Sequence, residues 1–157
     1  MRPSLLLSFL SALAFAAPAF AATSPNYAGS PMDDVAQITN ASGTTPVTLT
    51  TAGSNGSRRF SLSCTSTDTA AHSMAIAKVR SGVSYLLATV SIPANAGNVS
   101  GTPRVAVLST ANFPGIPLDP NGNPFLTMES GDTLTIAVSA AVTSGDLVSC
   151  EASGVNF

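Results

Sequence analysis

The sequence predicts an all-β protein: a single antiparallel β-sandwich of jelly-roll type, with seven or eight strands. Three observations favour this fold class. From Pro46 onward, short apolar runs rich in β-branched residues alternate with turns of Gly, Asn, Ser and Asp. Outside residues 1–21, no window keeps the 3.6-residue apolar period of an amphipathic helix. No Trp stands between the two cysteines, so the immunoglobulin signature is missing and a jelly roll is the better expectation.

Each strand is expected between two groups of turn residues. In chain order, the expected strands are Val47–Thr51, Arg59–Thr65, Met74–Val79, Tyr85–Ile92, Val105–Leu108, Phe125–Met128, Thr133–Val138 and Leu147–Ala152. The short run Val105–Leu108 could instead be a single helical turn. The turn at Gly53–Gly56 precedes the second strand, and Ser81-Gly82 should join the third and fourth strands as a hairpin.

Residues 1–21 have the features of an export signal. Arg2 gives a positive start, Leu5–Ala17 is an apolar run, and Ala19-Phe20-Ala21 is the small-x-small pattern read by signal peptidase. The run is shorter than the ~20 apolar residues that span a bilayer. We therefore expect a secreted or periplasmic protein with no stable membrane insertion.

The exported part should begin with a flexible N-terminal arm, residues 22–45, followed by the β-sandwich domain, residues 46–157. Proline, glycine, asparagine and serine interrupt any regular period in the arm. Within it, Asp33–Ile38 could form one strand or a short turn.

Charge limits the partners of the exported chain. Once Arg2 is removed, five basic residues stand against eight acidic ones, and the basic ones are scattered: Arg58, Arg59, Lys78, Arg80 and Arg104. Nucleic-acid binding needs a basic face that neutralises phosphates. Nucleic acid is therefore not expected as a partner.

The two cysteines are predicted to form a disulfide. Cysteines of exported proteins are oxidised by default. Cys64 alternates with serines in the run from Phe60 and Leu62, and Cys150 alternates with polar residues between Val148 and Ala152. Both sulfurs should therefore point into the same interior, where the bond would join an early and a late strand.

The sequence offers no evident catalytic site and no cofactor site. His72 is the only histidine, and it stands beside Ser73 in an expected surface turn, four residues after Asp68. Such sequence neighbours rarely have the geometry of a Ser-His-Asp triad. The carboxylates needed for glycosidase chemistry fall in the arm or in turns. These are Asp33, Asp34, Asp68, Asp119, Asp132 and Asp146. The protein is predicted not to be an enzyme.

Two kinds of ligand site find weak support. Asp119-Pro-Asn121-Gly-Asn123 is similar to the start of a calcium loop, but the twelfth position is Ser130 where a bidentate Glu is required. A tight turn is the simpler interpretation, and no metal site is predicted. The exported part has no Trp and few other aromatic residues for stacking sugars. The Asn-x-Ser/Thr triplets at Asn40, Asn55 and Asn98 are interpreted as chance occurrences.

Residues 112–125 are the candidate contact surface, although an inward-facing interpretation is favoured. The segment carries four prolines that fix the backbone before binding, and an unusual apolar load for a connection. Its large side chains are Phe113, Ile116, Leu118 and Phe125. In the alternative interpretation, these side chains turn inward and close an open end of the sandwich, because exposed apolar patches are rare on monomers.

Most of the chain from Pro46 to Phe157 resembles a group of small uncharacterised β-sandwich proteins encoded among tailed-phage virion genes. The segments that carry the resemblance are Gly53–Arg58, Thr65–His72, Tyr85–Val90, Phe113–Phe125 and Gly131–Leu134. The resemblance implies a β-sandwich that acts by packing on other copies or on partners. The export signal and the cysteine pair lie outside that pattern, which suggests a related domain adapted to the periplasm or the cell surface.

We therefore expect a non-enzymatic exported β-sandwich with a structural or binding role, in self-association or with a protein partner. Two alternatives stay open. A cell-surface adhesin or sugar-binding module would need exposed aromatics in one groove. A small secreted hydrolase would need His72 and a carboxylate to converge in a pocket.

Overall fold

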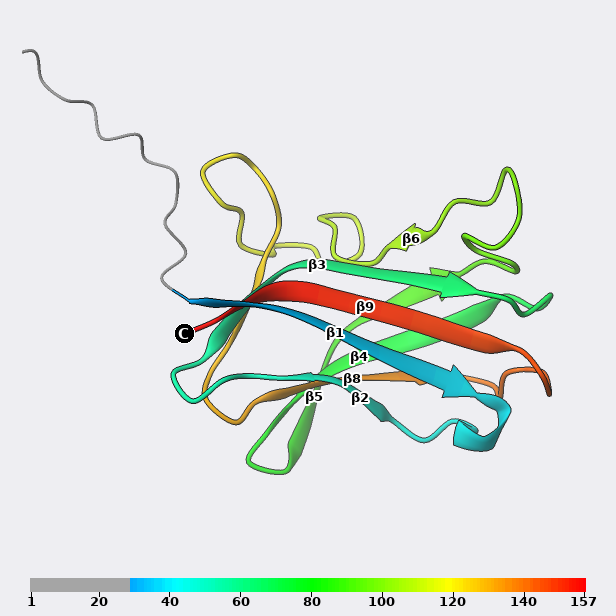
Figure 1. The fold of residues 1–157 in the computed structure, drawn as a ribbon, viewed down its shortest axis with the longest axis horizontal. Helices are drawn as coiled ribbons and strands as arrows, with labels where there is room; N and C mark the ends of the chain where they lie inside the picture. Colours follow the sequence, from blue (N-terminus) through cyan, green and yellow to red (C-terminus); the bar gives the residue numbers. More distant parts are fainter. Residues whose placement is uncertain (1–28) are drawn as a thin grey trace, which may run out of the picture.

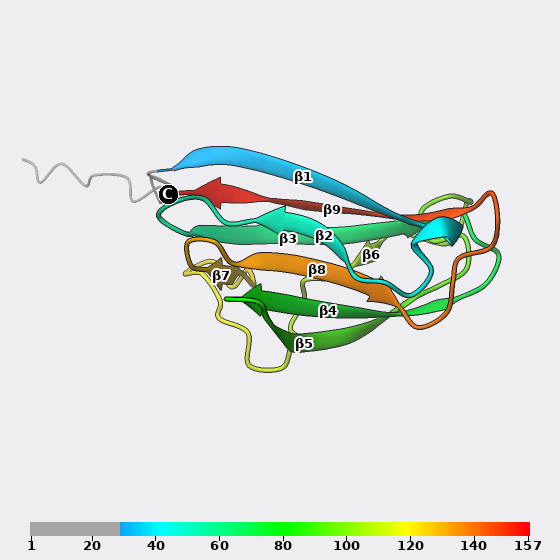
Figure 2. The same cartoon turned by 90° about the horizontal axis from the view of Figure 1, so that it is seen from below.

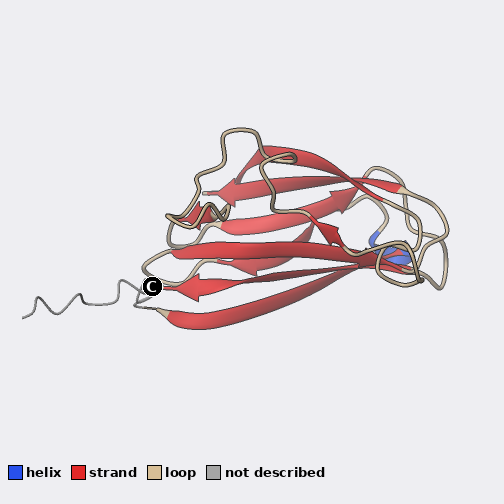
Figure 3. Cartoon of the chain, turned by 90° about the horizontal axis from the view of Figure 1, so that it is seen from above, coloured by secondary structure: helices blue, strands red, loops and turns tan. Residues whose placement is uncertain are grey.

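The computed structural model describes residues 29–157, in which two antiparallel sheets pack face to face (Figures 1 and 2). The nine strands are β1 (Ser30–Thr39), β2 (Val47–Thr51), β3 (Ser57–Ser66), β4 (His72–Arg80), β5 (Val83–Ile92), β6 (Val105–Ala106), β7 (Leu126–Met128), β8 (Thr133–Val138) and β9 (Leu147–Asn156). The helical piece is the short 3-10 turn η1 (Asn40–Ser42), drawn in blue in Figure 3. The predicted all-β sandwich is confirmed, with nine strands instead of seven or eight.

The strand order is that of a jelly roll. One sheet has the order β1-β9-β3, and both β6 and β7 pair with the free edge of β3. The other sheet has the order β2-β8-β4-β5. When β6 and β7 are counted together as one interrupted strand, each sheet has four strands. Consecutive strands then lie in different sheets, except at the β4–β5 hairpin. Residues 107–125 form the interruption.

The flexible arm expected at residues 22–45 is wrong for Ser30–Thr39, although the strand left open at Asp33–Ile38 is present. Ser30–Thr39 forms β1, which pairs with β9 in an unbroken register from Ser30↔Asn156 to Thr39↔Leu147. Ala36 and Ile38 point into the core, while Val35 and Gln37 face solvent. The apolar alternation over Asp33–Ile38 is short, so the pairing with β9, distant in sequence, decides the outcome. Residues 22–28 lie outside the described part of the chain.

A β-bulge in β3 overturns the expected orientation of Phe60. The register of β3 against β9 shifts between Arg59 and Ser61, so Arg59 takes the inward position and Phe60 is only half-buried. Leu62 and Cys64 point inward as the alternation predicts. A bulge moves every residue on one side of it by one place, which the alternation of apolar residues cannot reveal.

The fully buried Arg59 side chain is matched by oxygen atoms from both sheets. Its guanidinium donates to Thr50 Oγ1 at 2.7 Å and to the Thr51 carbonyl at 3.1 Å on β2, and to Asn156 Oδ1 at 3.3 Å on β9. Thr50 Oγ1 in turn donates to Asp34 on β1. Burial lowers the pKa of Arg59 and the charge of Asp34 opposes this shift, so the buried cation is compensated through Thr50.

The remaining expected strands are present with small changes of length. The β4–β5 hairpin turns at Ser81 and Gly82, both with positive φ (50° and 78°), as a two-residue hairpin turn requires. The segment Val105–Leu108 contains a strand of only two residues, β6. The last strand, β9, continues to Asn156 and lies between β1 and β3.

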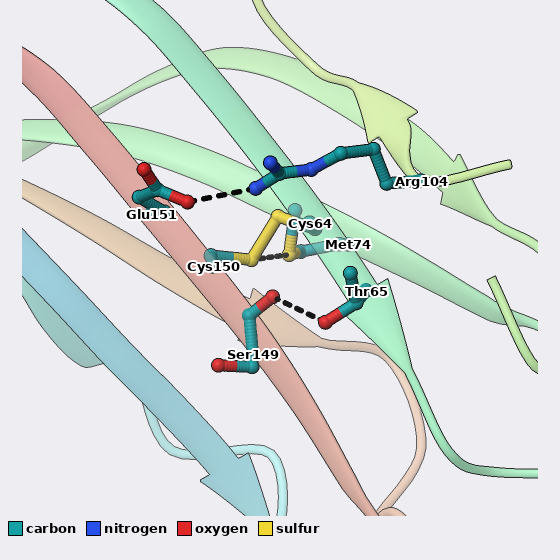
Figure 4. Close-up of a disulfide and its surroundings, with 7 residues drawn as sticks. All are labelled: Cys64, Thr65, Met74, Arg104, Ser149, Cys150 and Glu151. Carbon is teal, nitrogen blue, oxygen red and sulfur yellow. Dashed lines mark hydrogen bonds and ion pairs between the residues drawn. A yellow bond between two sulfur atoms is a disulfide. The ribbon is translucent and has the colours of Figure 1, made fainter. Parts of the chain in front are cut away.

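The predicted disulfide joins Cys64 of β3 to Cys150 of β9 (Figure 4). The two residues are directly opposite in the β3–β9 register, with their Cα atoms 4.2 Å apart, and both are buried in the core between the sheets. Met74 of β4 reaches across from the other sheet, its Sδ 3.7 Å from Cys150 Sγ. The bond therefore joins β3 to β9 on the core-facing side of their sheet.

Candidate functional site

His72 is not the expected surface turn residue. It opens β4 and is buried, with Nε2 2.9 Å from Asp68 Oδ2. Asp68 is fully buried and also accepts hydrogen bonds from the backbone N–H of Ala70 and from both the N–H and the hydroxyl of Thr143. The bonds from the Thr143 and Ala70 backbones, the largest causes, hold the pKa of Asp68 well below its ordinary value.

This buried cluster connects loops rather than presenting a reactive group. Asp68 lies between β3 and β4, Thr143 lies between β8 and β9, and the Asp68 carbonyl accepts from Asn95 N–H after β5. All three connections lie at the end of the sandwich opposite the C-terminus (Figure 1). The Thr143 hydroxyl bonds Asp68 and not the imidazole, and His72 Nδ1 is buried without a hydrogen-bond partner in the described residues. A Ser-His-Asp triad needs a hydroxyl nucleophile bonded to the imidazole, and the Thr143 hydroxyl does not take that position.

A second buried carboxylate, Asp132, is held by Arg80 of β4. The guanidinium makes two parallel bonds to it, Nε to Oδ1 at 2.8 Å and Nη2 to Oδ2 at 2.6 Å, and its third nitrogen lies 3.0 Å from Glu129 Oε1. The bond from Arg80 lowers the pKa of Asp132 to about 2. Asp132 also accepts the Glu129 N–H, so this group fixes the turn before β8.

Within the predicted contact segment, some side chains turn inward, as in the interpretation of a closing segment, and one is exposed, as in the interpretation of a contact surface. Phe113 is buried in the core, and Ile116 packs against it, as expected of a segment that closes the sandwich. Phe125 is half-buried, and its ring lies 5.2 Å from the Arg58 guanidinium, close enough for a cation–π contact. Leu118 is 49% exposed, and its backbone forms an isolated bridge with Pro124. Of the four residues, Leu118 alone presents a largely exposed side chain.

The calcium-like sequence forms a turn instead. Asp119 Oδ1 accepts the backbone N–H groups of Asn121 and Asn123, both at 2.8 Å, and Oδ2 accepts the Asn123 side-chain amide at 3.1 Å. Donor groups therefore point at the carboxylate where a cation would have to bind. In the described part of the chain, no group of three or more His, Cys, Asp or Glu side chains is placed to hold a metal ion.

A hollow of about 290 Å³ opens beside β3, where the strand opposite it is interrupted. β7 pairs with Ser57–Arg59 and β6 pairs with Ser63 and Cys64, and between these two pieces the Leu62 carbonyl accepts the backbone N–H groups of Val107 and Leu108. The lining residues are Phe60, Ser61, Leu62 and Ser63 of β3, Ala106 and Leu108 near β6, and Asp119, Asn123 and Pro124 of the interrupting segment. Neighbouring residues alone could not predict this hollow, because it depends on β6 and β7 pairing with β3 as two separate pieces.

The outer edge of β5 is the second surface feature. No described strand pairs with it, and Val83, Tyr85 and Leu86 are large apolar side chains exposed along it. The strand is ten residues long and contains neither a charged residue nor a proline. Tyr85 was expected within a strand, but only the sheet order shows that this strand is an edge.

Comparison with protein-family models, with curated proteins and with solved structures finds no match to the chain. Among residues 29–157, no helix is long and apolar enough to cross a membrane. The candidate sites therefore rest on their own geometry.

Proposed function

We propose that the chain is an exported, non-enzymatic structural protein that assembles with further copies of itself through the outer edge of β5. The observation that carries this proposal is the ten-residue uncharged edge strand with exposed Val83, Tyr85 and Leu86. An edge strand offers unpaired N–H and C=O groups, and natural proteins protect such edges unless they are used.

The other three edges of the sandwich carry such protection. β1 contains Pro31, Asp33 and Asp34, which disfavour pairing with a further strand. β2 has only five residues and a register shift between Thr48 and Thr50. The β6/β7 edge consists of two short pieces separated by the 107–125 segment. β5 has one bulge, at Leu87, but is the longest uncharged edge among the described strands.

The edge of β5 is also complementary to itself. Two copies related by a twofold axis can place β5 antiparallel to β5, because an isologous contact uses the same patch on both partners. Without charges on the strand, no like charges meet across the pair. The result would be one continuous sheet across the dimer, with Tyr85 and Leu86 covered.

Location and family likeness support the same role. The N-terminal export signal and the disulfide favour an oxidising compartment, secreted or periplasmic. The resemblance to small β-sandwich proteins encoded among tailed-phage virion genes implies a protein that works by packing on other copies or on partners. In this proposal, the jelly roll is the rigid body and β5 is its assembly surface.

Sedimentation analysis of the mature protein over a range of concentrations tests the proposal. The unmodified protein should form dimers or larger assemblies, and Leu86→Lys should shift them to monomers, because a strongly hydrated charge would then stand on the pairing edge of both copies. Val35→Lys is the matched control: Val35 is 62% exposed on edge strand β1, against 66% for Leu86 on β5. A protein that is monomeric at all concentrations, or equal effects of the two variants, would contradict assembly through β5.

A further inference from the structure

The hollow beside β3 has the shape of a small-molecule site. Its volume of about 290 Å³ is close to the lower limit of ~300 Å³ for ligand pockets. It is lined by β3 at Phe60–Ser63 and by the turn that contains Asp119 and Asn123. Strand and fixed turn make both surfaces stable before any ligand arrives.

The lining of this hollow combines polar and apolar groups. Ser61 and Ser63 add hydroxyls, Asp119 a carboxylate and Asn123 an amide, while Phe60 and Pro124 contribute apolar surface. The hollow's lining contains no basic residue, so an anionic ligand would meet only the charge of Asp119. A purely apolar ligand would cover the acceptor positions of Asp119 that the turn leaves open without replacing the water bound there.

Asp119 is prepared to accept hydrogen bonds from a ligand. The backbone N–H of Asn123, the largest cause, holds its pKa below the ordinary value, so the group stays an acceptor at neutral pH. Each carboxylate oxygen can accept about two hydrogen bonds. Oδ2 accepts one, from the Asn123 amide at 3.1 Å, which leaves an acceptor beside an amide. Two adjacent hydroxyl groups of a ligand, each both a donor and an acceptor, match the carboxylate oxygen of Asp119 and the side-chain amide of Asn123.

From these features, we infer that the hollow beside β3 binds one neutral hexose ring. Two neighbouring hydroxyls would bond Asp119 and Asn123, Ser61 and Ser63 would reach further hydroxyls, and the apolar face of the ring would lie toward Phe60 and Pro124. This site is separate from the β5 edge, which belongs to the other sheet. Sugar binding would add to the assembly role a means of attachment to a glycan surface.

Amide-resolved NMR titration of the mature protein with D-glucose, D-galactose, D-mannose and N-acetyl-D-glucosamine tests the inference. At least one of these sugars should shift the amides of residues 60–63 and 119–123 in a saturable way. Asp119→Asn keeps an oxygen for the turn but removes the charged acceptor, so it should weaken binding by about tenfold or more. Ser61→Leu should abolish binding by filling the hollow.

Asp33→Asn is the matched control, because it makes the same change of charge on exposed β1 and should leave the titration unchanged. The spectra of each variant alone show whether it is folded. Absence of saturable shifts with all four sugars, shifts confined to other residues, or equal binding by Asp119→Asn would overturn the inference. Sedimentation of Asp119→Asn should match that of the unmodified protein, so failure here is distinguishable from failure of assembly through β5.

Discussion

The buried charges of this small sandwich hold its loops and sheets in place. Arg59 is enclosed between the sheets with partners on β2 and β9, whereas Asp68 and Asp132 are enclosed at turns by backbone N–H groups or by Arg80. A charge removed from water is tolerated only where hydrogen bonds replace its hydration. Each of these groups has such bonds, which explains how a chain with few charged residues can bury three of them.

The Arg80–Asp132 pair predicts how stability responds to acid. In the folded protein, Arg80 lowers the pKa of Asp132 to about 2 from an ordinary value of 3.8. As pH falls from about 4 to about 2, the unfolded chain therefore binds a proton at this position before the folded one does, and the free energy of unfolding decreases. Denaturant unfolding at a series of pH values from 7 to 2.5 measures this loss.

Asp132→Asn serves as the comparison for that acid effect. It should be less stable than the unmodified protein at neutral pH, because the paired carboxylate is gone, and it should lose less stability on acidification. Asp33→Asn, at an exposed carboxylate, should keep the full acid dependence. Identical pH profiles for Asp132→Asn and the unmodified protein would show that the pair does not contribute to stability.

At the scale of elements, local patterns predicted strands well wherever turn residues bound them on both sides. Thr133–Val138 and the hairpin at Ser81-Gly82 are where the sequence places them. β1 was treated as an arm with a possible strand, because its pairing with β9 depends on residues more than a hundred positions away. The bulge at Arg59 is equally hidden, since a local alternation favours Phe60 as the inward residue.

The candidate sites also separate into features that local sequence patterns predict and features that depend on residues distant in sequence. The disulfide could be predicted, because export and matched alternation are both local signals in the sequence. The burial of His72 could not, since it depends on Asp68 and Thr143 meeting at the end of the sandwich. The hollow and the β5 edge follow from strand order, which neighbouring residues do not encode.

Gly154 of β9 is predicted to be required by the bulge of β3. It lies opposite Arg59 in the register, where a Cβ atom would collide with the Arg58 carbonyl oxygen, well inside van der Waals contact. Because that oxygen belongs to the backbone, relief needs a shift of the whole strand. Gly154→Ala should therefore lower the free energy of unfolding by about 1–3 kcal/mol, measured by denaturant titration. Ser153→Ala, one position away, is the control and should change stability far less.

At the scale of the whole molecule, three groups of contacts stabilise different parts of the sandwich. The Arg59 group fastens the sheets at the end near the C-terminus, the Asp68 group joins the loops at the other end, and the disulfide lies in the core between them. The two polar groups act in the folded state. The disulfide acts chiefly on the unfolded chain, whose freedom it reduces across a separation of 86 residues.

Removal of the disulfide should therefore cost stability without changing the fold. On the chain-entropy description, a loop of this length is stabilised by about 4–5 kcal/mol, and native disulfides usually contribute about 2–5 kcal/mol. The β3–β9 pairing extends from Ser57 to Ser66 and does not depend on the bond. The double variant Cys64→Ala/Cys150→Ala should keep its circular dichroism spectrum but unfold at lower denaturant concentration, and the reduced unmodified protein should behave like it. Reductant should leave the unfolding of the double variant unchanged, which separates loss of the bond from other effects of the reagent. A loss of less than about 1 kcal/mol would contradict this account, because it would mean that residual structure already restricts the unfolded chain when the bond is absent.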